Sequence, residues 1–357
     1  MHPFARLAST LLVFGLLLSQ LGACGRAPET PADSDQGGSG LALTGAGSTF
    51  AAPFFEKLME VYRADHPELH LSYGAVGSGE GIDRFLAGSV DIGATDAPLS
   101  ASEAEGVAGG VLQLPVIAGM IAITYNLPGI ESPLNLPRDV YADIFLGKID
   151  RWSDPRIAAA NLGVDLPHKL IQIVARLDSS GTTFAFTNHL AAISPEWANG
   201  PGVGKQIDWP GGTMVARGNE GVAHRIKITE GSIGYVESGF AERLRLPLAW
   251  LENRAGGFVK PNVETGQRAL AGGSDTVPDD LRLIITDPEG ARSYPIVTYT
   301  WVLLRGAYAD PAKTAALRDM IRWALTSGQE YAEPLRYVPL PNNVVQAALT
   351  ELDQFGG

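Results

Sequence analysis

The stretch LTGAGSTF at residues 43–50 marks the turn around which the chain is expected to fold. A short strand is expected over residues 41–44, and the apolar residues of 50–63 recur at helical spacing. The glycines let the backbone come close to a ligand, and Ser48 or Thr49 can cap the helix that follows. Because a capped helix start is common and usually structural, this stretch alone predicts only a strand that turns into a helix.

Strands and helices are expected to alternate along the rest of the chain, which predicts α/β layers. The expected strands cover residues 69–76, 90–94, 116–125 and 170–175, and the expected helices cover 81–87 and 182–192. Three further segments of small and hydroxyl residues stand where strands end: VGSGEG at 76–81, DIGATDAP at 91–98 and RLDSSGTT at 176–183. Since ligands of open α/β sheets bind at the carboxyl ends of the strands, the four segments are expected to face one cleft.

The polar groups of these segments favour an anion as the ligand. Helix N-termini carry free N–H groups and a partial positive charge, which makes them ready anion sites. Arg176 supplies a fixed positive charge, and Asp178 is placed to orient it. The alternative interpretation of this pair is a surface ion pair that contributes little.

Asp96 is an unexpected residue in such a site, because a carboxylate repels an anion. It fits if the anion carries a proton that the carboxylate can accept, as HPO₄²⁻ and H₂PO₄⁻ do and sulfate at neutral pH does not. A buried acceptor that faces sulfate unpaired is heavily penalised. The alternative is that Asp96 caps a turn before Pro98, which is common. Physical reasoning alone leaves both interpretations open.

The N-terminal residues are expected to be a targeting segment and a tether. A basic residue precedes a mostly apolar run over residues 7–18, and LGAC at 21–24 resembles the bacterial lipobox, in which the cysteine is lipidated. We therefore expect a lipoprotein signal peptide over 1–23, lipidation of Cys24 and a flexible tether over 24–40. Cys24 is the only cysteine of the chain, which favours this interpretation over an ordinary signal peptide with a chance cysteine.

Composition and motifs argue against several other classes. The net charge of −12 and the lack of any basic run argue against a nucleic-acid binder, because phosphate backbones demand clustered Lys and Arg. None of the four segments holds a histidine that could activate a nucleophile, and neither a G-x-S-x-G elbow nor a Walker A motif occurs. His66 and His70 alone among the six histidines are four residues apart, and Pro67 disrupts that pair as a helical metal site. We therefore expect a protein that is not an enzyme and that binds neither a metal nor another cofactor.

Taken together, the segments resemble the phosphate-binding proteins of bacterial ABC phosphate importers. The shared motifs, in order, are LTGAGSTF at 43–50, GSG at 77–79, ATDAP at 94–98, IFLGKI at 144–149 with Trp152, RLDSSGT at 176–182 and GSIGYVE at 231–237. The similarity runs from about residue 43 to about residue 344, and the joint order and spacing of these short motifs are very specific. The resemblance implies a type II periplasmic binding protein-like fold, in which two α/β domains are joined by two β-strand crossovers with a ligand cleft between them.

The resemblance also implies where the domains divide. Crossovers are expected near residues 119–126 and 294–304, both apolar and rich in β-forming residues. The first domain is then discontinuous, with residues 41–120 and 298–357, and the second domain covers 121–297.

Residue by residue, the resemblance implies which groups hold phosphate. The expected set is Thr49 and Phe50 from the first helix turn, Ser78 from the second, Asp96 as proton acceptor, Arg176 for charge, and Ser180, Gly181 and Thr182 from the last turn, with Asp178 pairing the arginine. The chain departs from the family pattern at three positions where alanine, glycine or another small residue is frequent: Ser48, Glu80 and Ser179. The two serines suit a donor-rich site, whereas the glutamate is expected to point away, since a carboxylate facing the ligand would weaken anion binding.

The function that this resemblance implies is high-affinity binding of inorganic phosphate outside the cytoplasmic membrane and delivery to the permease subunits of an ABC phosphate importer. The protein is then expected in the periplasm or on the cell surface, held to a membrane by the lipid on Cys24. Three alternatives stay open: a surface hydrolase such as a phosphatase, a receptor for sulfate or another oxyanion, and a surface protein that uses this architecture for sensing or adhesion.

Overall fold

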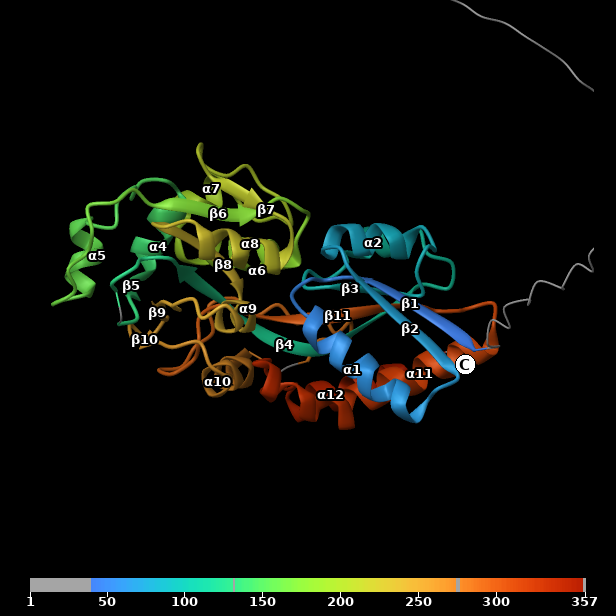
Figure 1. Ribbon diagram of the computed structural model, residues 1–357. Helices are drawn as coiled ribbons and strands as arrows, with labels where there is room; N and C mark the ends of the chain where they lie inside the picture. The colour runs from blue at the N-terminus through green and yellow to red at the C-terminus, as the bar shows by residue number, and fades with distance from the viewer. Residues whose placement is uncertain (1–39, 131, 274–276, 356–357) are drawn as a thin grey trace, which may run out of the picture. The chain divides into compact units, whose positions relative to one another are not determined.

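One mixed sheet of eight strands runs through the described chain, in the order β2-β1-β3-β11-β4-β8-β6-β7 (Figure 1). The computed structural model describes residues 40–130, 132–273 and 277–355, so the expected signal peptide, Cys24 and nearly all of the expected tether lie outside the described residues. The strands of this sheet are β1 (Leu41–Gly47), β2 (Leu69–Ala75), β3 (Ile92–Thr95), β4 (Val111–Tyr125), β6 (Gln172–Arg176), β7 (Met214–Ala216), β8 (Ser232–Glu237) and β11 (Val297–Arg305). A second, three-stranded sheet holds β5 (Asn135–Leu136), β9 (Trp250–Glu252) and β10 (Phe258–Val259).

The long strand β4 belongs to both halves of the eight-stranded sheet. Its residues 111–120 pair antiparallel with β11, and its residues 121–125 pair antiparallel with β8. We call β1, β2, β3, β11 and residues 111–120 the first lobe, and β6, β7, β8 and residues 121–125 the second lobe, each with the helices packed on it. Within the lobes, β1 is parallel to β2 and β3, and β6 is parallel to β7 and β8. The α/β fold class expected from the sequence is confirmed, and the domain limits stay a prediction.

Helices cover the sheet in both lobes. In the first lobe α1 packs on β2, α2 on β1 and β3, and α11 and α12 on β4, and in the second lobe α6, α8 and α9 pack on β8 (Figure 1). The helices are α1 (Ala52–Asp65), α2 (Ser78–Leu86), α3 (Ala101–Ala104), α4 (Arg138–Phe145), α5 (Pro155–Ala160), α6 (Gly181–Ile193), α7 (Pro195–Asn199), α8 (Gly218–Ile228), α9 (Ser238–Arg243), α10 (Val263–Gly273), α11 (Pro311–Leu325) and α12 (Asn342–Asp353), with 3₁₀ turns η1 (Ser327–Tyr331) and η2 (Glu333–Leu335). In the described part of the chain, no helix combines the length and the apolar character that a membrane span needs.

The apolar pattern accounts for most of these elements. On α1, Phe54, Leu58 and Tyr62 recur every four residues and are buried against the sheet. Strand β4 is buried along nearly its whole length because it is central to the sheet. It begins at Val111, five residues before the expected start, and it contains Pro115, which pairs with Trp301 at an irregularity where Val116 of β4 has no partner on β11. A proline is tolerated in a strand at such an irregularity, so it did not end the strand here.

Candidate functional site

The end of β1 brings the first segment against Asp96. Gly47 has a φ of +144°, and a Cβ added to it would lie 1.9 Å from the carbonyl oxygen of Ala94 on β3, so no other residue fits there. This close approach places the hydroxyl of Ser48 at 2.5 Å from Oδ1 of Asp96, to which it donates. The ends of β1 and β3 therefore form one polar surface in the first lobe.

Thr49 and Phe50 lie in a bend before α1, and the expectation that they belong to its first turn is wrong. The helix begins at Ala52 with Pro53 in its first turn. A proline has no N–H to donate, so a helix that started at residue 50 would lose an internal hydrogen bond at Pro53. The expected side-chain cap is also absent from the helix start, because the N-cap position is Ala51. The hydroxyl of Ser48 accepts instead from the amide of Ala51 at 3.2 Å.

The second segment starts α2 at Ser78, three residues earlier than expected. Gly79 and Gly81 have low helix propensity, so the sequence pattern did not predict this first turn as helical. Both are required by contacts, since an added Cβ would lie 2.2 Å from the hydroxyl of Ser179 at Gly79 and 2.2 Å from the Cα of Gly47 at Gly81. The hydroxyl of Ser78 accepts from the amide of Asp96 at 3.2 Å, which joins the second segment to the third.

The carboxylate of Asp96 does not cap the turn before Pro98. Thr95 holds that turn, because its hydroxyl donates to the carbonyl of Ala97 at 2.7 Å and accepts from the amide of Ala97 at 3.1 Å. Oδ1 of Asp96 accepts from two hydroxyls, that of Ser48 and that of Thr300 at 2.7 Å. Burial raises the pKa of Asp96 to about 6, although both hydroxyls and the charge of Arg176 act to lower it. Of the two interpretations, the structure supports Asp96 as a buried acceptor in a polar site.

Arg176 and Asp178 form a buried pair, and the surface interpretation is wrong: their side chains are 1 % and 7 % exposed. Nε of Arg176 donates to Oδ1 of Asp178 at 2.9 Å, and Nη2 of Arg176 donates to Oδ2 of the same carboxylate. Burial alone would raise the pKa of Asp178, but the bonds and charge of Arg176 and the amide of Gly218 together lower it below its usual value. The carboxylate is therefore ionised and holds the guanidinium in place.

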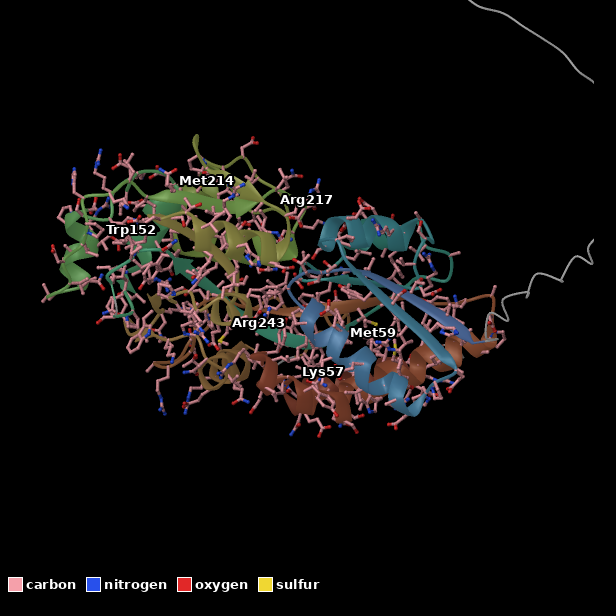
Figure 2. The ribbon with its side chains drawn as sticks, viewed as in Figure 1. Lys57, Met59, Trp152, Met214, Arg217 and Arg243 are labelled. Carbon is pink, nitrogen blue, oxygen red and sulfur yellow. The ribbon has the colours of Figure 1, made fainter. Side chains whose placement is uncertain are left out.

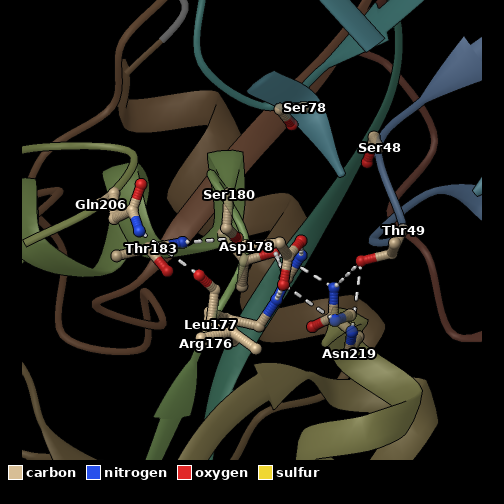
Figure 3. A network of polar contacts seen from close by, with 12 residues as sticks. Ser48, Thr49, Ser78, Arg176, Leu177, Asp178, Ser180, Thr183, Gln206 and Asn219 are labelled. Carbon is tan, nitrogen blue, oxygen red and sulfur yellow. Dashed lines mark hydrogen bonds and ion pairs between the residues drawn. The ribbon is translucent and has the colours of Figure 1, made fainter. Parts of the chain in front are cut away.

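The fourth segment starts α6 and meets the first lobe. Ser180 caps this helix, because its hydroxyl accepts from the amide of Thr183 at 3.1 Å. A Cβ added to Gly181 would lie 2.6 Å from the Cβ of Asp96 and 2.6 Å from the hydroxyl of Ser78. The amide of Gly79 also donates to the carbonyl of Ser179 at 3.0 Å. The structure thus brings all four predicted segments together at the contact between the lobes. Figure 3 labels residues from three of these segments, including Ser48, Ser78 and Arg176.

Several buried residues at this contact have backbone amides with no acceptor among the described protein groups, among them Phe50, Ser78, Gly181 and Thr182. Buried N–H groups are nearly always hydrogen-bonded in native proteins. Next to them lies the guanidinium of Arg176, whose Nη1 reaches the hydroxyl of Thr182 at 3.3 Å. Converging amides around one guanidinium can bind an anion with several acceptor oxygens.

Two residues of this network were not predicted. Thr300 comes from β11, 204 residues after Asp96, and no local sequence pattern predicts a contact over that separation. Asn219 donates to the hydroxyls of Thr49 and Thr182. It could have been found, because Gly218 and Asn219 follow the short strand β7 and open α8, which repeats the strand, small residue and helix design of the other segments.

A cleft of about 1330 Å³ lies beside the contact and is lined by both lobes, with Thr49 and Glu80 from the first and Asp178, Arg217 and Arg243 from the second. Figure 2 labels Arg217 and Arg243. The carboxylate of Glu80 accepts from Nε of Arg84 at 2.8 Å and is about half exposed, so it takes no part in the buried network. It lines the cleft, and that it points away from the ligand stays a prediction. No cluster of three or more metal-binding side chains occurs in the part of the chain that the structure describes.

Two lobes that share a central strand, with an anion-binding arrangement where they meet, define the class of two-lobed binding proteins. A family model described as a PBP superfamily domain matches residues 27–327. A phosphate-binding protein PstS of Xylella fastidiosa is 38 % identical over 318 residues, which cover 89 % of this chain and 86 % of the relative. Another PstS, from Methanocaldococcus jannaschii, is 37 % identical over 370 residues and covers 96 % and 94 %. The chain belongs to the PstS phosphate-binding protein family within the PBP superfamily.

Solved structures agree on the fold. A high-affinity periplasmic phosphate-binding protein, PfluDING, solved with bound phosphate, has a TM-score of 0.71 at 20 % identity and covers 87 % of this chain and 93 % of its own. A phosphate ABC transporter substrate-binding protein from Clostridium perfringens, described as putative and also solved with phosphate, has a TM-score of 0.62 at 18 % identity and covers 84 % and 100 %. The two-domain type II periplasmic binding protein fold expected from the sequence is confirmed.

Proposed function

We propose that this chain binds inorganic phosphate with high affinity outside the cytoplasmic membrane and delivers it to an ABC import permease. Its relatives are named phosphate-binding proteins, and solved structures of the same fold hold phosphate. The observation that carries the proposal is the buried carboxylate of Asp96, set among N–H and O–H donors at the contact between the lobes. This combination suits an oxyanion that still carries a proton.

In this proposal phosphate accepts from the amides of the turns and from the guanidinium of Arg176. The donors come from Thr49, Phe50 and Ser78 in the first lobe and from Arg176, Ser180, Gly181 and Thr182 in the second. Asp178 holds the arginine and does not touch the ligand. Because each lobe supplies part of the set, the anion favours the closed arrangement of the lobes over an open one.

The proton of phosphate explains the choice against sulfate. Ser48 and Thr300 both donate to Oδ1 of Asp96, so neither hydroxyl engages Oδ2. Phosphate donates its proton to this carboxylate, whereas fully ionised sulfate would face it with no proton between them. Rejection by an unpaired buried group reaches about 10⁴-fold in sites built for a hydrogen bond.

We also propose that the chain is a receptor and not a hydrolase. A hydrolase would need a base beside a nucleophilic hydroxyl. His189, the histidine nearest in sequence to the fourth segment, is buried, and its Nε2 lies 2.8 Å from the hydroxyl of Tyr141. Burial lowers the pKa of His189 to about 3, so it stays neutral in the protein core. Release of nitrophenol from nitrophenyl phosphate at a rate above buffer would contradict this part of the proposal.

Calorimetric titration with phosphate, then sulfate, tests the receptor function. The protein is first stripped of bound ligand by partial unfolding and dialysis. We expect one phosphate per chain, no heat with sulfate at pH 7.5, and at least about a hundredfold weaker phosphate binding by Arg176→Ala, which loses a charge-assisted contact. Equal affinity for both anions, or an Arg176→Ala variant that binds normally, would contradict the proposed site.

The attachment of the protein to a membrane belongs to the same proposal. Cys24 carries the lipid, residues 24–40 form the tether, and the folded body divides into 41–120 with 298–357 and 121–297. The pairing of β4 with β11 up to residue 120 and with β8 from residue 121 supports this division. Fractionation of cells that express the wild type or Cys24→Ala tests the anchor: the wild type is expected with membranes and the variant in the soluble extracytoplasmic fraction. Equal distribution of the two would rule the anchor out.

A further inference from the structure

Asn219 lies at the contact between the lobes and is completely buried (Figure 3). It is the second residue of α8 and follows Gly218, whose φ of +68° needs glycine. Its side-chain oxygen Oδ1 accepts from the amide of Glu237 at 2.9 Å, which fixes the side chain to the second lobe. Its side-chain nitrogen Nδ2 therefore faces a definite direction, toward two threonines.

One side-chain amide joins hydroxyls of both lobes. Nδ2 of Asn219 donates to Oγ1 of Thr49 in the first lobe at 3.0 Å and to Oγ1 of Thr182 in the second at 3.1 Å. The backbone amide of Asn219 adds a second bond to Oγ1 of Thr49 at 3.2 Å. The two bonds to Thr49 cross from one lobe to the other, so they exist only when the lobes are in contact.

These bonds decide which way the hydroxyl protons point. A hydroxyl has one proton and two lone pairs. Oγ1 of Thr49 accepts two bonds from Asn219, and Oγ1 of Thr182 accepts one from Asn219 and one from Arg176 at 3.3 Å. With both lone pairs occupied, each hydroxyl can act further only as a donor. A donor is what an anion at this position requires.

We propose that Asn219 is a positioning residue for anion capture, which turns the hydroxyl protons of Thr49 and Thr182 toward the anion as the lobes close. The inference rests on the proposed function, since it assumes that phosphate binds at this contact. It adds a residue that does not touch the ligand and yet links closure to binding. Loss of Asn219 weakens anion binding in two ways. The closed state loses bonds that favour it over the open state, and the hydroxyls of Thr49 and Thr182 become free to turn their protons away from the anion.

Three variants test the proposal in phosphate-free buffer. Asn219→Ala removes all side-chain bonds, and we expect about 10- to 100-fold weaker phosphate binding, mostly from faster release. Asn219→Asp keeps the acceptor for Glu237 and the side-chain shape, but both threonines must then donate to the new carboxylate instead of the anion. We expect Asn219→Asp to lose more phosphate affinity than Asn219→Ala, whereas a purely structural role of Asn219 predicts that Asn219→Asp, which keeps the side-chain shape, loses less. Asn188→Ala is the control, since among the described residues its side chain bonds Thr286 and nothing in the first lobe, and it is expected to bind normally.

A double-mutant cycle separates hydroxyl orientation from the charge that aspartate adds. If Asn219 acts through Thr49, the affinity loss of Thr49→Val with Asn219→Ala is smaller than the product of the two single losses by about fivefold or more. Thermal unfolding without phosphate checks that each variant is folded. Binding by Asn219→Ala within twofold of wild type, or losses that multiply fully, would overturn the inference. A wild-type protein that binds no phosphate would instead overturn the proposed function.

Discussion

At the scale of single residues, Asp96 carries a charge that its surroundings oppose. Burial raises its pKa from 3.8 to about 6, and the hydroxyls of Ser48 and Thr300 and the charge of Arg176 limit the rise. A shift of about two units corresponds to roughly 3 kcal/mol against the ionised form. Because the folded pKa is above the unfolded one, this carboxyl stabilises the protein below about pH 4 and loses that contribution as the pH rises through 6. At pH 7 and above it is ionised and can only accept.

The protonation of Asp96 predicts a pH-dependent choice of anion. A protonated Asp96 is a donor and tolerates sulfate, whose charge does not change in this range. We expect sulfate affinity to rise about tenfold per unit as the pH falls from 8 toward 6, and to level off below 6. Calorimetric titration of sulfate at several pH values measures this.

The same experiment on Asp96→Asn isolates the carboxylate. The amide of asparagine can keep the bonds from Ser48 and Thr300 through its oxygen and present its N–H₂ to the anion. This variant is expected to bind sulfate at every pH, with phosphate preferred by no more than about tenfold. Sulfate affinity of the wild type that is weak and flat from pH 8 to pH 5 would contradict the role of Asp96.

At the scale of elements, the sequence predicted the order of strands and helices better than their starting residues. The pattern placed Ser78 before α2, but the helix begins at Ser78. The prediction missed this start because the first turn contains Gly79 and Gly81, which lower helix propensity but are needed for close contacts with Ser179 and Gly47. It placed Phe50 inside α1, but Pro53 moves the start to Ala52. Thr300 could not be predicted at all, since it reaches the site from a strand 204 residues away.

The junction of β8 and α9 contains a second buried carboxyl, that of Glu237. Its Oε1 accepts from the amide of Gly239 and the hydroxyl of Ser238, while its Oε2 is buried and has no partner among the described groups. Burial raises the pKa of Glu237 from 4.5 to about 7, although these bonds and the charge of Arg243 act to lower it. The ionised form is therefore costly at this junction, which adjoins the residues of β4 that leave the first lobe.

Replacement of Glu237 by glutamine is expected to remove this cost. The wild-type carboxyl contributes stability below about pH 4.5 and loses it as the pH rises through 7, and a shift of about 2.5 units corresponds to roughly 3 kcal/mol. Glu237→Gln should gain up to about 3 kcal/mol over the wild type between pH 4.5 and pH 8, measured by urea unfolding without phosphate. Glu60→Gln, at an exposed carboxylate of α1, is the control and should show no such gain. A constant difference between Glu237→Gln and the wild type across this range would contradict the argument.

At the scale of the whole described fold, the contact between the lobes is the feature that the sequence could least define. The four segments were predicted because each carries a local strand and turn pattern, whereas the crossover near residues 119–126 was implied by the family resemblance. The bonds that cross between the lobes depend on how two separately folded surfaces meet. Asn219 with Thr49 is one such bond, and Lys205 with Glu103 at 3.1 Å is another.

The ion pair of Lys205 and Glu103 is expected to favour closure. The side chains are 27 % and 38 % exposed, so the pair is worth up to about 1 kcal/mol, or about fivefold in affinity. Glu103→Gln removes the charge and keeps a residue that can cap α3 beside Ser100. We expect Glu103→Gln and Lys205→Gln each to weaken phosphate binding two- to fivefold, the double variant to be no worse than either, and all differences to vanish in 1 M salt.

Lys313→Gln breaks a comparable pair with Asp91 inside the first lobe and should leave affinity unchanged. Equal losses of affinity in the three single variants would show that the pair between the lobes has no special role in closure.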